Sequence, residues 1–482
     1  MKRIHIFSFA LCLLMQFFQV SIAQQTRLFS KTFGGANYDV GSAILQTGDS
    51  GFIIAGQTMS YGDTLGDAYL VRINREGNEI WDKSYSQRLL GGANAIAPAS
   101  DGGFLLAGHS ETDSFDCQFY LIRVNSSGDT IWTRMFGGVY DDAASAVIQT
   151  NDGNFVLAGF ADENSPSGSD AYIVKIDISG NILWAKKYGS TANEYANSIR
   201  QTADGGYIFA GKKENPTAGY DVYLVKLDSS GNKQWEKTYG GNKDDLAYCV
   251  RNCKDGGYVI SGLTYSFGNG SADIYLIRIN ATGDLLWTKT FGGNLFDQSY
   301  DILQVEDSGF MVAGFTRSFG DTMNDIYIIS TDKNGMMNWS KTMGGKGDDV
   351  ALSIIESFDK TYVIAGRTSG FGAGNADMFV FQMDDKGTSS TGVGEIIRNP
   401  GMSTVFPNPF SENATLTYAN SKNKNTTLFI YDLNGKLITE LKDTGIGSFH
   451  IEKNYLSNGI YFYRLLDADE NTLIGKGKFV VE

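Results

Sequence analysis

Short runs of β-branched and aromatic residues alternate with Gly, Asp and Asn along most of the chain, and no stretch keeps a helical period. One unit, starting at Phe296, reads FDQSYDILQVEDSGFMVAGFTRSFGDTMNDIYIISTDKNGMMNWSKTMGG. It contains four strand-like runs, SYDILQV, GFMVAGFT, DIYIIST and MNWSKTM, each bounded by turn residues. The pattern predicts four antiparallel strands per unit, with a short hairpin such as Asn280–Asp284 between the third and the fourth.

The unit recurs along residues 26–390. All six Trp lie on one lattice with spacings of 51 or 52 residues: Trp81, Trp132, Trp184, Trp235, Trp287 and Trp339. The aromatic residue after the DGGF-like turn recurs too, as Phe52, Phe104, Phe155, Tyr207, Tyr258, Phe310 and Tyr362. Repeats of about 40–50 residues with four strands each are typical of β-propellers. We therefore predict an all-β protein whose main domain is a seven-bladed β-propeller; a β-solenoid and a string of small domains are the alternatives.

The first strand of each unit has small residues, such as Ala43, Ala95 and Ala144, that suit the narrow axis of a propeller. We interpret as packing between blades both the Trp column and the aromatic column within runs such as DIYLIRI, namely Tyr69, Tyr120, Tyr172, Tyr223, Tyr275, Tyr327 and Phe379. The segment RLFSKTFGG, residues 27–35, resembles a fourth strand without its first three, and the last unit has no fourth strand of its own. We therefore predict that this segment pairs with DMFVFQM, residues 377–383, and closes the ring.

The repeat ends after Gly387, and residues 391–403 are predicted to be a linker rich in Ser, Thr and Gly. In residues 404–482, strand-like runs with Asn-Gly turns predict a small β-sandwich. Four short motifs stand in this tail, with the residues Pro407, Asn408, Pro409, Asp432, Gly435, Lys436, Gly459, Tyr461, Lys476 and Lys478.

On these motifs the tail resembles the C-terminal sorting domain of the type IX secretion system of Bacteroidetes. The resemblance implies passage through the outer membrane by the type IX secretion machinery, and usually removal of the domain or its exchange for a surface anchor. The alternative is an adhesive β-sandwich without a role in export. The repeats themselves are similar to those of secreted bacterial propellers, which indicates the fold better than the function.

The N-terminus has the pattern of a signal peptide. Lys2 and Arg3 precede an apolar run over residues 4–20, and Ser21-Ile22-Ala23 fits a cleavage site. No other stretch approaches the about 20 apolar residues of a membrane span, so no transmembrane segment is expected. We predict a leader at 1–23, a propeller at 24–390 and a sorting domain at 404–482. The protein is expected to be a monomer that passes through the periplasm and is then secreted or attached to the outer surface.

The net charge of −14 makes nucleic acid an unexpected partner, because an acidic surface repels phosphate groups. Cys117, Cys249 and Cys253 do not form a disulfide framework and are interpreted as small hydrophobic residues. Outside the leader only His109 and His450 remain, which supplies neither a zinc site nor a Ser-His-Asp triad. We assign no catalytic residue and no metal ligand.

Acidic residues are the remaining candidates for a site. One column stands four residues after the second Gly of each Gly-Gly pair, as Asp39, Asp142, Glu194, Asp245, Asp297 and Asp349. These carboxylates either line a rim that holds a cation such as Ca²⁺ or a cationic ligand, or they cap turns by bonding to the backbone; we favour capping. The same two interpretations apply to a second column, Asp67, Asp170, Asp221, Asp273, Asp325 and Asp377.

Blade two departs most from the repeat. It has Gly91 in place of the acid and Gln118 in place of Asp, together with Pro98, His109 and Cys117. A ligand site at His109 and Gln118 and a relaxed constraint explain this equally well.

For function we predict a binding or adhesion module for glycans or proteins. The alternatives are a polysaccharide lyase or glycosidase, which needs paired carboxylates about 5–9.5 Å apart, and a structural surface component. The near-uniform blades argue against catalysis, because a catalytic site needs unlike residues at one place.

Overall fold

The computed structural model describes residues 28–482 apart from 63–65, 86–90, 112–116, 139, 163–167, 321–322, 390–395, 399–402, 407–408, 419–424, 434, 444–447 and 468–472. The predicted signal peptide and most of the predicted linker lie outside these residues. Within them, the only regular element besides strands is the single turn of 3-10 helix η1 (Lys453–Tyr455). The predicted all-β class is therefore confirmed.

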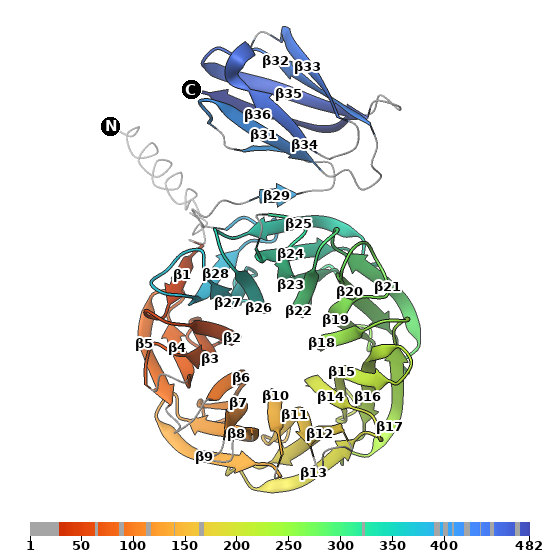
Figure 1. Cartoon of the computed structure of the whole chain (residues 1–482). Helices are drawn as coiled ribbons and strands as arrows, with labels where there is room; N and C mark the ends of the chain where they lie inside the picture. Colours follow the sequence, from red (N-terminus) through yellow and green to blue (C-terminus); the bar gives the residue numbers. More distant parts are fainter. Residues whose placement is uncertain are drawn as a thin grey trace, which may run out of the picture.

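Most of the described chain forms antiparallel sheets of four consecutive strands that stand around a central opening, the architecture of a β-propeller (Figure 1). We call each sheet a blade and number the blades in chain order. The first strands are β2 (Asp39–Gln46), β6 (Gly91–Pro98), β10 (Asp142–Gln149), β14 (Glu194–Gln201), β18 (Asp245–Asn252), β22 (Asp297–Gln304) and β26 (Asp349–Glu356). The second strands are β3 (Phe52–Thr58), β7 (Phe104–Glu111), β11 (Phe155–Asp162), β15 (Tyr207–Asn215), β19 (Tyr258–Thr264), β23 (Phe310–Thr316) and β27 (Tyr362–Thr368).

The outer half of each blade follows the same order. The third strands are β4 (Asp67–Ile73), β8 (Cys117–Val124), β12 (Ser169–Ile176), β16 (Gly219–Leu227), β20 (Asp273–Ile279), β24 (Asp325–Thr331) and β28 (Asp377–Met383). The fourth strands are β5 (Glu79–Tyr85), β9 (Thr130–Phe136), β13 (Ile182–Tyr188), β17 (Lys233–Tyr239), β21 (Leu285–Phe291), β25 (Met337–Met343) and, for blade seven, β1 (Ser30–Phe33).

Burial differs between the strands of a blade. Third strands such as β20 are buried along their whole length, whereas fourth strands such as β9 are mostly exposed at the outside of the ring. The first strands stand nearest the opening, as predicted (Figure 1). Each first strand also has a register shift near its middle, as between Ala196 and Ser198 in β14. This β-bulge adds one unpaired residue beside the channel in every blade.

The Trp column packs one blade against the next, as predicted. Trp184 of β13 lies 6.0 Å from the ring of Tyr207 in the following blade. The turn between the third and fourth strands then passes over the Trp ring of the preceding blade. At Gly283 this turn has a φ of +83°, and a Cβ atom there would come within 3.2 Å of Trp235. Glycine is therefore required both by the backbone conformation and by the approach of the ring.

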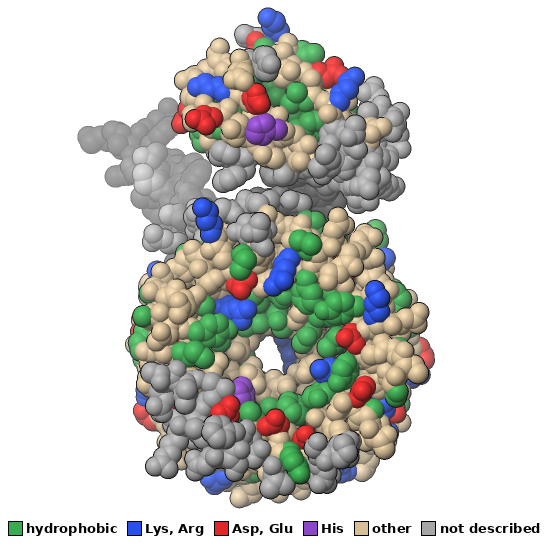
Figure 2. Space-filling model, in the orientation of Figure 1, with side chains coloured by type: hydrophobic (Ala, Val, Ile, Leu, Met, Phe, Trp, Pro, Cys, Tyr) green, Lys and Arg blue, Asp and Glu red, His purple; other side chains and the backbone are tan. Residues whose placement is uncertain are grey.

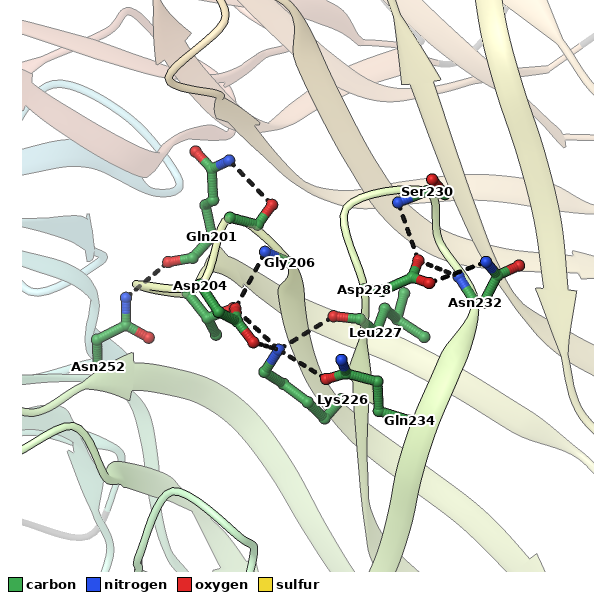
Figure 3. A network of polar contacts seen from close by, with 12 residues as sticks. Gln201, Asp204, Gly206, Lys226, Leu227, Asp228, Ser230, Asn232, Gln234 and Asn252 are labelled. Atoms are coloured by element: carbon green, nitrogen blue, oxygen red, sulfur yellow. Dashed lines mark hydrogen bonds and ion pairs between the residues drawn. The ribbon is translucent and has the colours of Figure 1, made fainter.

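One face of the ring carries the turns between strands one and two and between strands three and four; we call it the hairpin-turn face. Figure 3 shows it in blade four, where the buried Nζ of Lys226 donates to Asp204 (2.8 Å), to the carbonyl of Leu227 (3.1 Å) and to Gln234 (3.1 Å). Asp204 also accepts the N–H of Gly206 and so holds the first turn. The same pairing of a third-strand cation with a turn Asp occurs in blades one to five: Arg72–Asp49, Arg123–Asp101, Lys175–Asp152, Lys226–Asp204 and Arg278–Asp255.

Strand β1 closes the ring by pairing antiparallel with β28, in the register Ser30 to Phe381 through Phe33 to Met378. The predicted closure by the N-terminal strand is therefore confirmed. Phe29 takes the place that Trp has in the other blades, since a Cβ on the turn residue Gly77 would lie 2.4 Å from its ring. Only 4% of Phe29 and 7% of Phe33 are exposed, so the closure has its own hydrophobic contacts.

Part of the predicted linker is a strand. Residues Ile396–Arg398 form β29, which pairs antiparallel with Ser340–Thr342 of β25 and makes blade six five-stranded. The physical reason is that β25 is the outermost strand of its blade and leaves backbone groups available along its outer edge. Composition alone indicated only a loop.

The tail forms two further antiparallel sheets, as the β-sandwich prediction requires. One contains β30 (Ser403–Phe406), β31 (Asn413–Tyr418) and β34 (Ser448–Glu452). The other contains β33 (Leu437–Asp443), β32 (Thr426–Tyr431), β35 (Gly459–Asp467) and β36 (Leu473–Val481). Their inner faces share one apolar core that includes Phe410, Leu428 and Phe479.

Candidate binding site at the channel mouth

The second face of the ring carries the connections between strands two and three and the crossings from each fourth strand to the next first strand; we call it the long-loop face. In the view of Figure 2, hydrophobic side chains surround the central opening, with Lys or Arg and Asp or Glu side chains among them. The repeated acids of the crossings lie at the end of the channel on the long-loop face, and so do several residues that differ between blades. We call this end the channel mouth.

The first acidic column is buried at the crossings. Each of its six carboxylates is at most 1% exposed. Each accepts the N–H of the residue four positions earlier, from Gly35 (2.8 Å), Gly138 (2.6 Å), Ser190 (3.2 Å), Gly241 (2.7 Å), Gly293 (2.8 Å) and Gly345 (2.7 Å). Asp297 accepts a second bond from the hydroxyl of Ser318 (2.6 Å) and a third from Thr316. This geometry is that of a turn cap, because in each of the six acids a carboxylate oxygen accepts a backbone N–H of its own crossing.

The second acidic column lies beside the first. A Cβ on Gly292 would lie 2.0 Å from Asp273 Oδ1 and 2.6 Å from Asp297 Oδ2, so the two carboxyl groups approach each other across this glycine. Burial, and then the charge of Asp297, raise the pKa of Asp273 to about 6 against the opposing bond from the N–H of Asn269. No group of three or more His, Cys, Asp or Glu residues suited to a metal ion occurs in the described part of the chain.

The two candidates in blade two do not converge. Gln118 is 8% exposed, and its Nε2 donates to the carbonyls of Gly138 and Tyr140, both at 3.2 Å, so it supports the crossing into blade three. His109 pairs across the sheet with Gly92 and Phe119. Burial lowers the pKa of His109, which keeps its imidazole neutral at pH 7. Cys117 donates its backbone N–H to Asp141, and Cys249 and Cys253 are free thiols in the core.

Sequence reasoning missed two positions around the mouth whose residues differ between blades. One such position follows the glycine in the second strand and is Gln57, His109, Phe160, Lys212, Leu263, Phe315 or Arg367. The other is the bulge residue of the first strand, which is Ser42, Asn94, Ser145, Asn197, Tyr248, Tyr300 or Leu352. The signal was present in the sequence as variation at fixed positions, but only the fold shows that both positions surround the mouth.

Blades three and four contribute a lysine held between aromatic rings. Lys212 Nζ lies 4.4 Å from the centroid of the Tyr195 ring and 4.5 Å from that of Tyr220. Phe160 meets Tyr195 edge-on at 5.0 Å. Burial lowers the pKa of Lys212, although the carboxylate of Asp244 opposes this. All four ring and cation side chains are partly exposed, so a ligand has access to an ammonium group framed by tyrosines.

Blades five to seven contribute an arc of aromatic rings. Tyr248 and Tyr300 lie 5.3 Å apart, and Tyr300 lies 6.2 Å from Phe315. The arc ends at Arg367, whose guanidinium lies 5.8 Å from the ring of Tyr38 and donates to its hydroxyl at 2.8 Å. Burial raises the pKa of Tyr248 to about 12, so this phenol stays protonated and presents a hydroxyl group. The mouth thus combines apolar ring faces with hydroxyl, ammonium and guanidinium donors.

The predicted sorting motifs stabilise turns and core packing in the tail. Asp432 accepts the N–H of Lys436 at 2.9 Å around Gly435, which has a φ of +79°. Tyr461 is buried on Phe479 (5.6 Å) and donates to the carbonyl of Ser457 at 2.9 Å. The remaining motif residues are Pro409 and Lys478, both exposed, Gly459 and Lys476, which belong to β35 and β36, and Pro407 and Asn408, which lie outside the described residues.

Comparison with known proteins identifies the tail. Residues 404–482 match the family described as the secretion system C-terminal sorting domain. The regulatory protein FlaEY of Caulobacter vibrioides is 24% identical over 233 residues, which cover 40% of this chain and 24% of that protein, so the chain spans about a quarter of its length. Among solved structures, Sqt1 from Chaetomium thermophilum has 11% identity and a TM-score of 0.44, and covers 76% of this chain and 87% of its own. A puromycin hydrolase has 14% identity and a TM-score of 0.48, over 80% and 59%.

The sorting domain makes this a secreted or cell-surface protein, exported through interaction with a type IX secretion machinery. Among the described residues, no helix has the length and hydrophobicity that a membrane span requires.

Proposed function

We propose that the protein is a secreted or surface-displayed binding module whose propeller takes up a glycan at the channel mouth. The observation that supports this is the set of partly exposed aromatic rings beside Lys212 and Arg367. Sugar rings present apolar faces that stack on tyrosine and phenylalanine, and their hydroxyl groups bond to cationic and phenolic donors. Binding sites in general combine an apolar lining with a few directed polar groups, as this mouth does.

The chemistry of the acids supports binding over catalysis on polysaccharides. A retaining or inverting glycosidase needs two carboxyl groups that both reach the scissile bond. The six acids of the first column are instead buried, as are four of the six in the second, and the first column accepts backbone N–H groups of the crossings. Several of the residues that differ from blade to blade at the mouth are aromatic or cationic, such as Tyr248, Lys212 and Arg367, which suits recognition.

The proposal is tested by screening the purified protein on a glycan array and measuring the affinity for the glycan found. Tyr300→Ala and Lys212→Ala are expected to weaken binding by about tenfold or more, because each removes a central contact. The matched control is Phe358→Ala, which removes an aromatic side chain that is 67% exposed on the hairpin-turn face. Equal affinities for the mouth variants and the control would place the ligand elsewhere and refute the proposal.

Export has a separate test. We expect a chain that lacks residues 404–482 to accumulate in the periplasm, while the full chain reaches the medium or the cell surface. Cell fractionation and protease accessibility of intact cells distinguish the two locations. Normal surface delivery of the truncated chain would show that the tail is not required for sorting.

A further inference from the structure

A second group of charged residues lies deeper in the channel, on the first strands of blades four, five and six. Arg251 of β18 makes a two-pronged ion pair with Asp301 of β22, at 2.7 and 2.9 Å from Nη2 to the two carboxylate oxygens. Asp301 is 5% exposed and also accepts the N–H of Ile354 (3.1 Å) and the thiol of Cys249 (3.1 Å). This carboxylate is therefore fully bonded inside the wall of the channel.

The preceding blade has an arginine at the position equivalent to Arg251, but within the residues that the structure describes it has no carboxylate partner equivalent to Asp301. Arg200 of β14 stands six residues after Glu194, as Arg251 stands six residues after Asp245. The position in the next blade that Asp301 fills for Arg251 is filled for Arg200 by Cys249, which has a thiol and no carboxylate. Among the described residues, the guanidinium of Arg200 makes one hydrogen bond, from Nη1 to the carbonyl of Ile199 at 2.7 Å, and no ion pair.

The electrostatics around Arg200 favour an anion. Two guanidinium groups and one carboxylate leave one positive charge in the wall of the channel, in a protein whose net charge is −14. Burial, and then the charge of Arg251, lower the pKa of Arg200 to about 10. For Arg251, burial opposes the charged form, but the carboxylate of Asp301 outweighs it and raises the pKa. Arg200 lacks the compensation that Arg251 has.

We infer that Arg200, with Arg251 beside it, binds an oxyanion in the channel, namely a carboxylate or sulfate group of a ligand. The planar fork of donors on a guanidinium matches two oxygens of such a group, and the Arg251–Asp301 pair shows that geometry within the same wall. Arg200 is partly exposed to the channel, and the opening in the space-filling view has Lys or Arg side chains at its wall (Figure 2). The inference is independent of the proposed glycan site at the mouth, which uses other residues.

Sodium sulfate and sodium acetate are the probes, each compared with sodium chloride at equal ionic strength. Thermal unfolding of the purified protein is expected to shift upward in a saturable way with sulfate or acetate below about 50 mM, because binding to the folded state alone raises stability. The probe with the lower dissociation constant distinguishes a sulfate from a carboxylate ligand. No saturable difference from chloride with either probe would overturn the inference.

Three variants and one control locate the site. Arg200→Met is expected to weaken the binding of the probe by about tenfold, and Arg200→Lys less, because lysine keeps the charge and loses the fork. Arg134→Met is the matched control, since Arg134 also makes a single bond to its own strand, from Nη1 to the carbonyl of Thr133 (2.9 Å), but on the exposed outside of the ring. Unchanged probe affinity in Arg200→Met, or an equal loss in Arg134→Met, would overturn the inference.

The third variant, Cys249→Asp, keeps Arg200 and supplies the missing carboxylate. It copies the Arg251–Asp301 pair into the preceding blade, so the probe effect is expected to disappear although the arginine remains. Retained probe binding in a folded Cys249→Asp protein would contradict the inference. If this variant does not fold, the comparison of Arg200→Met with Arg134→Met decides the question.

Discussion

On the hairpin-turn face, five blades set an Arg or Lys of the third strand against the Asp of the first turn, in nearly the same geometry. On the long-loop face, the residue after the second-strand glycine is of six different types in seven blades. Between these two sets stand the buried acids of the crossings, which recur although they belong to the long-loop face. The face on which a residue lies therefore does not by itself tell whether it stabilises the fold or belongs to the candidate binding site.

This comparison indicates that the residues that recur in most blades are those that form hydrogen bonds or ion pairs within the protein. Lys226 and Asp297 each bond to backbone or side-chain partners in the protein, and most blades make the same bonds. Lys212 and Arg367 contact rings at the mouth and are not required in other blades. Variants of repeated residues should thus change stability, and variants of unrepeated mouth residues should change binding.

The largest loss of stability is expected when the strand that closes the ring is removed. Deleting residues 28–33 removes the strand that pairs with β28 and two buried phenylalanines, so we expect loss of cooperative unfolding. Phe29→Ala alone should lower the free energy of unfolding by about 3–5 kcal/mol, since it empties the place that Trp fills in other blades. Denaturant unfolding followed by tyrosine and tryptophan fluorescence measures both effects.

The control for ring closure is Ile131→Ala, which removes a side chain that is 53% exposed on β9. This change should stay within about 0.5 kcal/mol of the parent protein. A deletion of residues 28–33 that unfolds as cooperatively as the parent would mean that the ring does not depend on its closing strand.

The next effect concerns the hairpin-turn face. Arg123 is 1% exposed, pairs with Asp101 and donates to the carbonyl of Phe104 at 3.0 Å. Arg123→Ala should cost about 3 kcal/mol, because the buried carbonyls of Phe104 and Val124 lose their donor and the large side chain leaves a cavity, while the half-exposed Asp101 is solvated by water. Arg123→Lys should cost much less, since Lys175 and Lys226 fill this position in blades three and four. Equal losses of unfolding free energy for the two variants would show that the position requires more than a cation.

The acids of the crossings test the distinction between residues that stabilise the fold and residues that bind a ligand, because these acids recur in most blades and yet lie near the mouth. Asp297→Ala should lower stability by about 2–3 kcal/mol, since the N–H of Gly293 and the hydroxyl of Ser318 lose a buried acceptor. Chelation with EDTA should leave the unfolding midpoint of the parent protein within about 1 °C if these carboxylates are caps. A large EDTA effect that Asp297→Ala abolishes would instead identify them as cation ligands.

A smaller effect is expected from the pairing of the two acidic columns. Asp273 has a pKa of about 6 in the folded protein, above its ordinary value of 3.8, so the folded state holds a proton that the unfolded chain has released. Its contribution to stability is therefore complete below about pH 4 and is lost as the pH rises to about 6. Asp273→Asn should reduce the fall in unfolding midpoint across this window, and an unchanged slope would argue against the shifted pKa.

The smallest effect on stability is expected at the mouth. Lys212→Met should change the free energy of unfolding by no more than about 1 kcal/mol, because the loss of contacts with two rings is offset by removal of a partly buried charge. The same variant should lose binding to the glycan identified on the array. A strong loss of stability would show that Lys212 stabilises the fold, and it would weaken the distinction between stabilising residues and binding residues.

The candidate site was less predictable than the fold. The acidic columns, His109 and Gln118 attracted attention because they are polar or irregular, and the structure directs the carboxylates of the first column and Gln118 toward the backbone of the crossings. Tyr248 and Tyr300 looked like ordinary strand residues until the bulge in each first strand placed them beside the channel. A bulge shifts the alternation of inward and outward residues by one position, and in a strand of only eight residues the sequence alone does not show where that shift falls.

The sequence by itself determined the propeller, the closing strand and the sorting tail, because each depends on local pattern: strand runs between turn glycines, KTFGG without its first three strands, and short motifs in order. Only the tertiary structure decided which residues meet across blades. Arg251 forms an ion pair with Asp301 of the next blade. Arg200 has the same place in its own repeat, but the corresponding residue of its next blade is Cys249. The physical reason is that such contacts join positions about 50 residues apart, where ring geometry and not local preference brings side chains together.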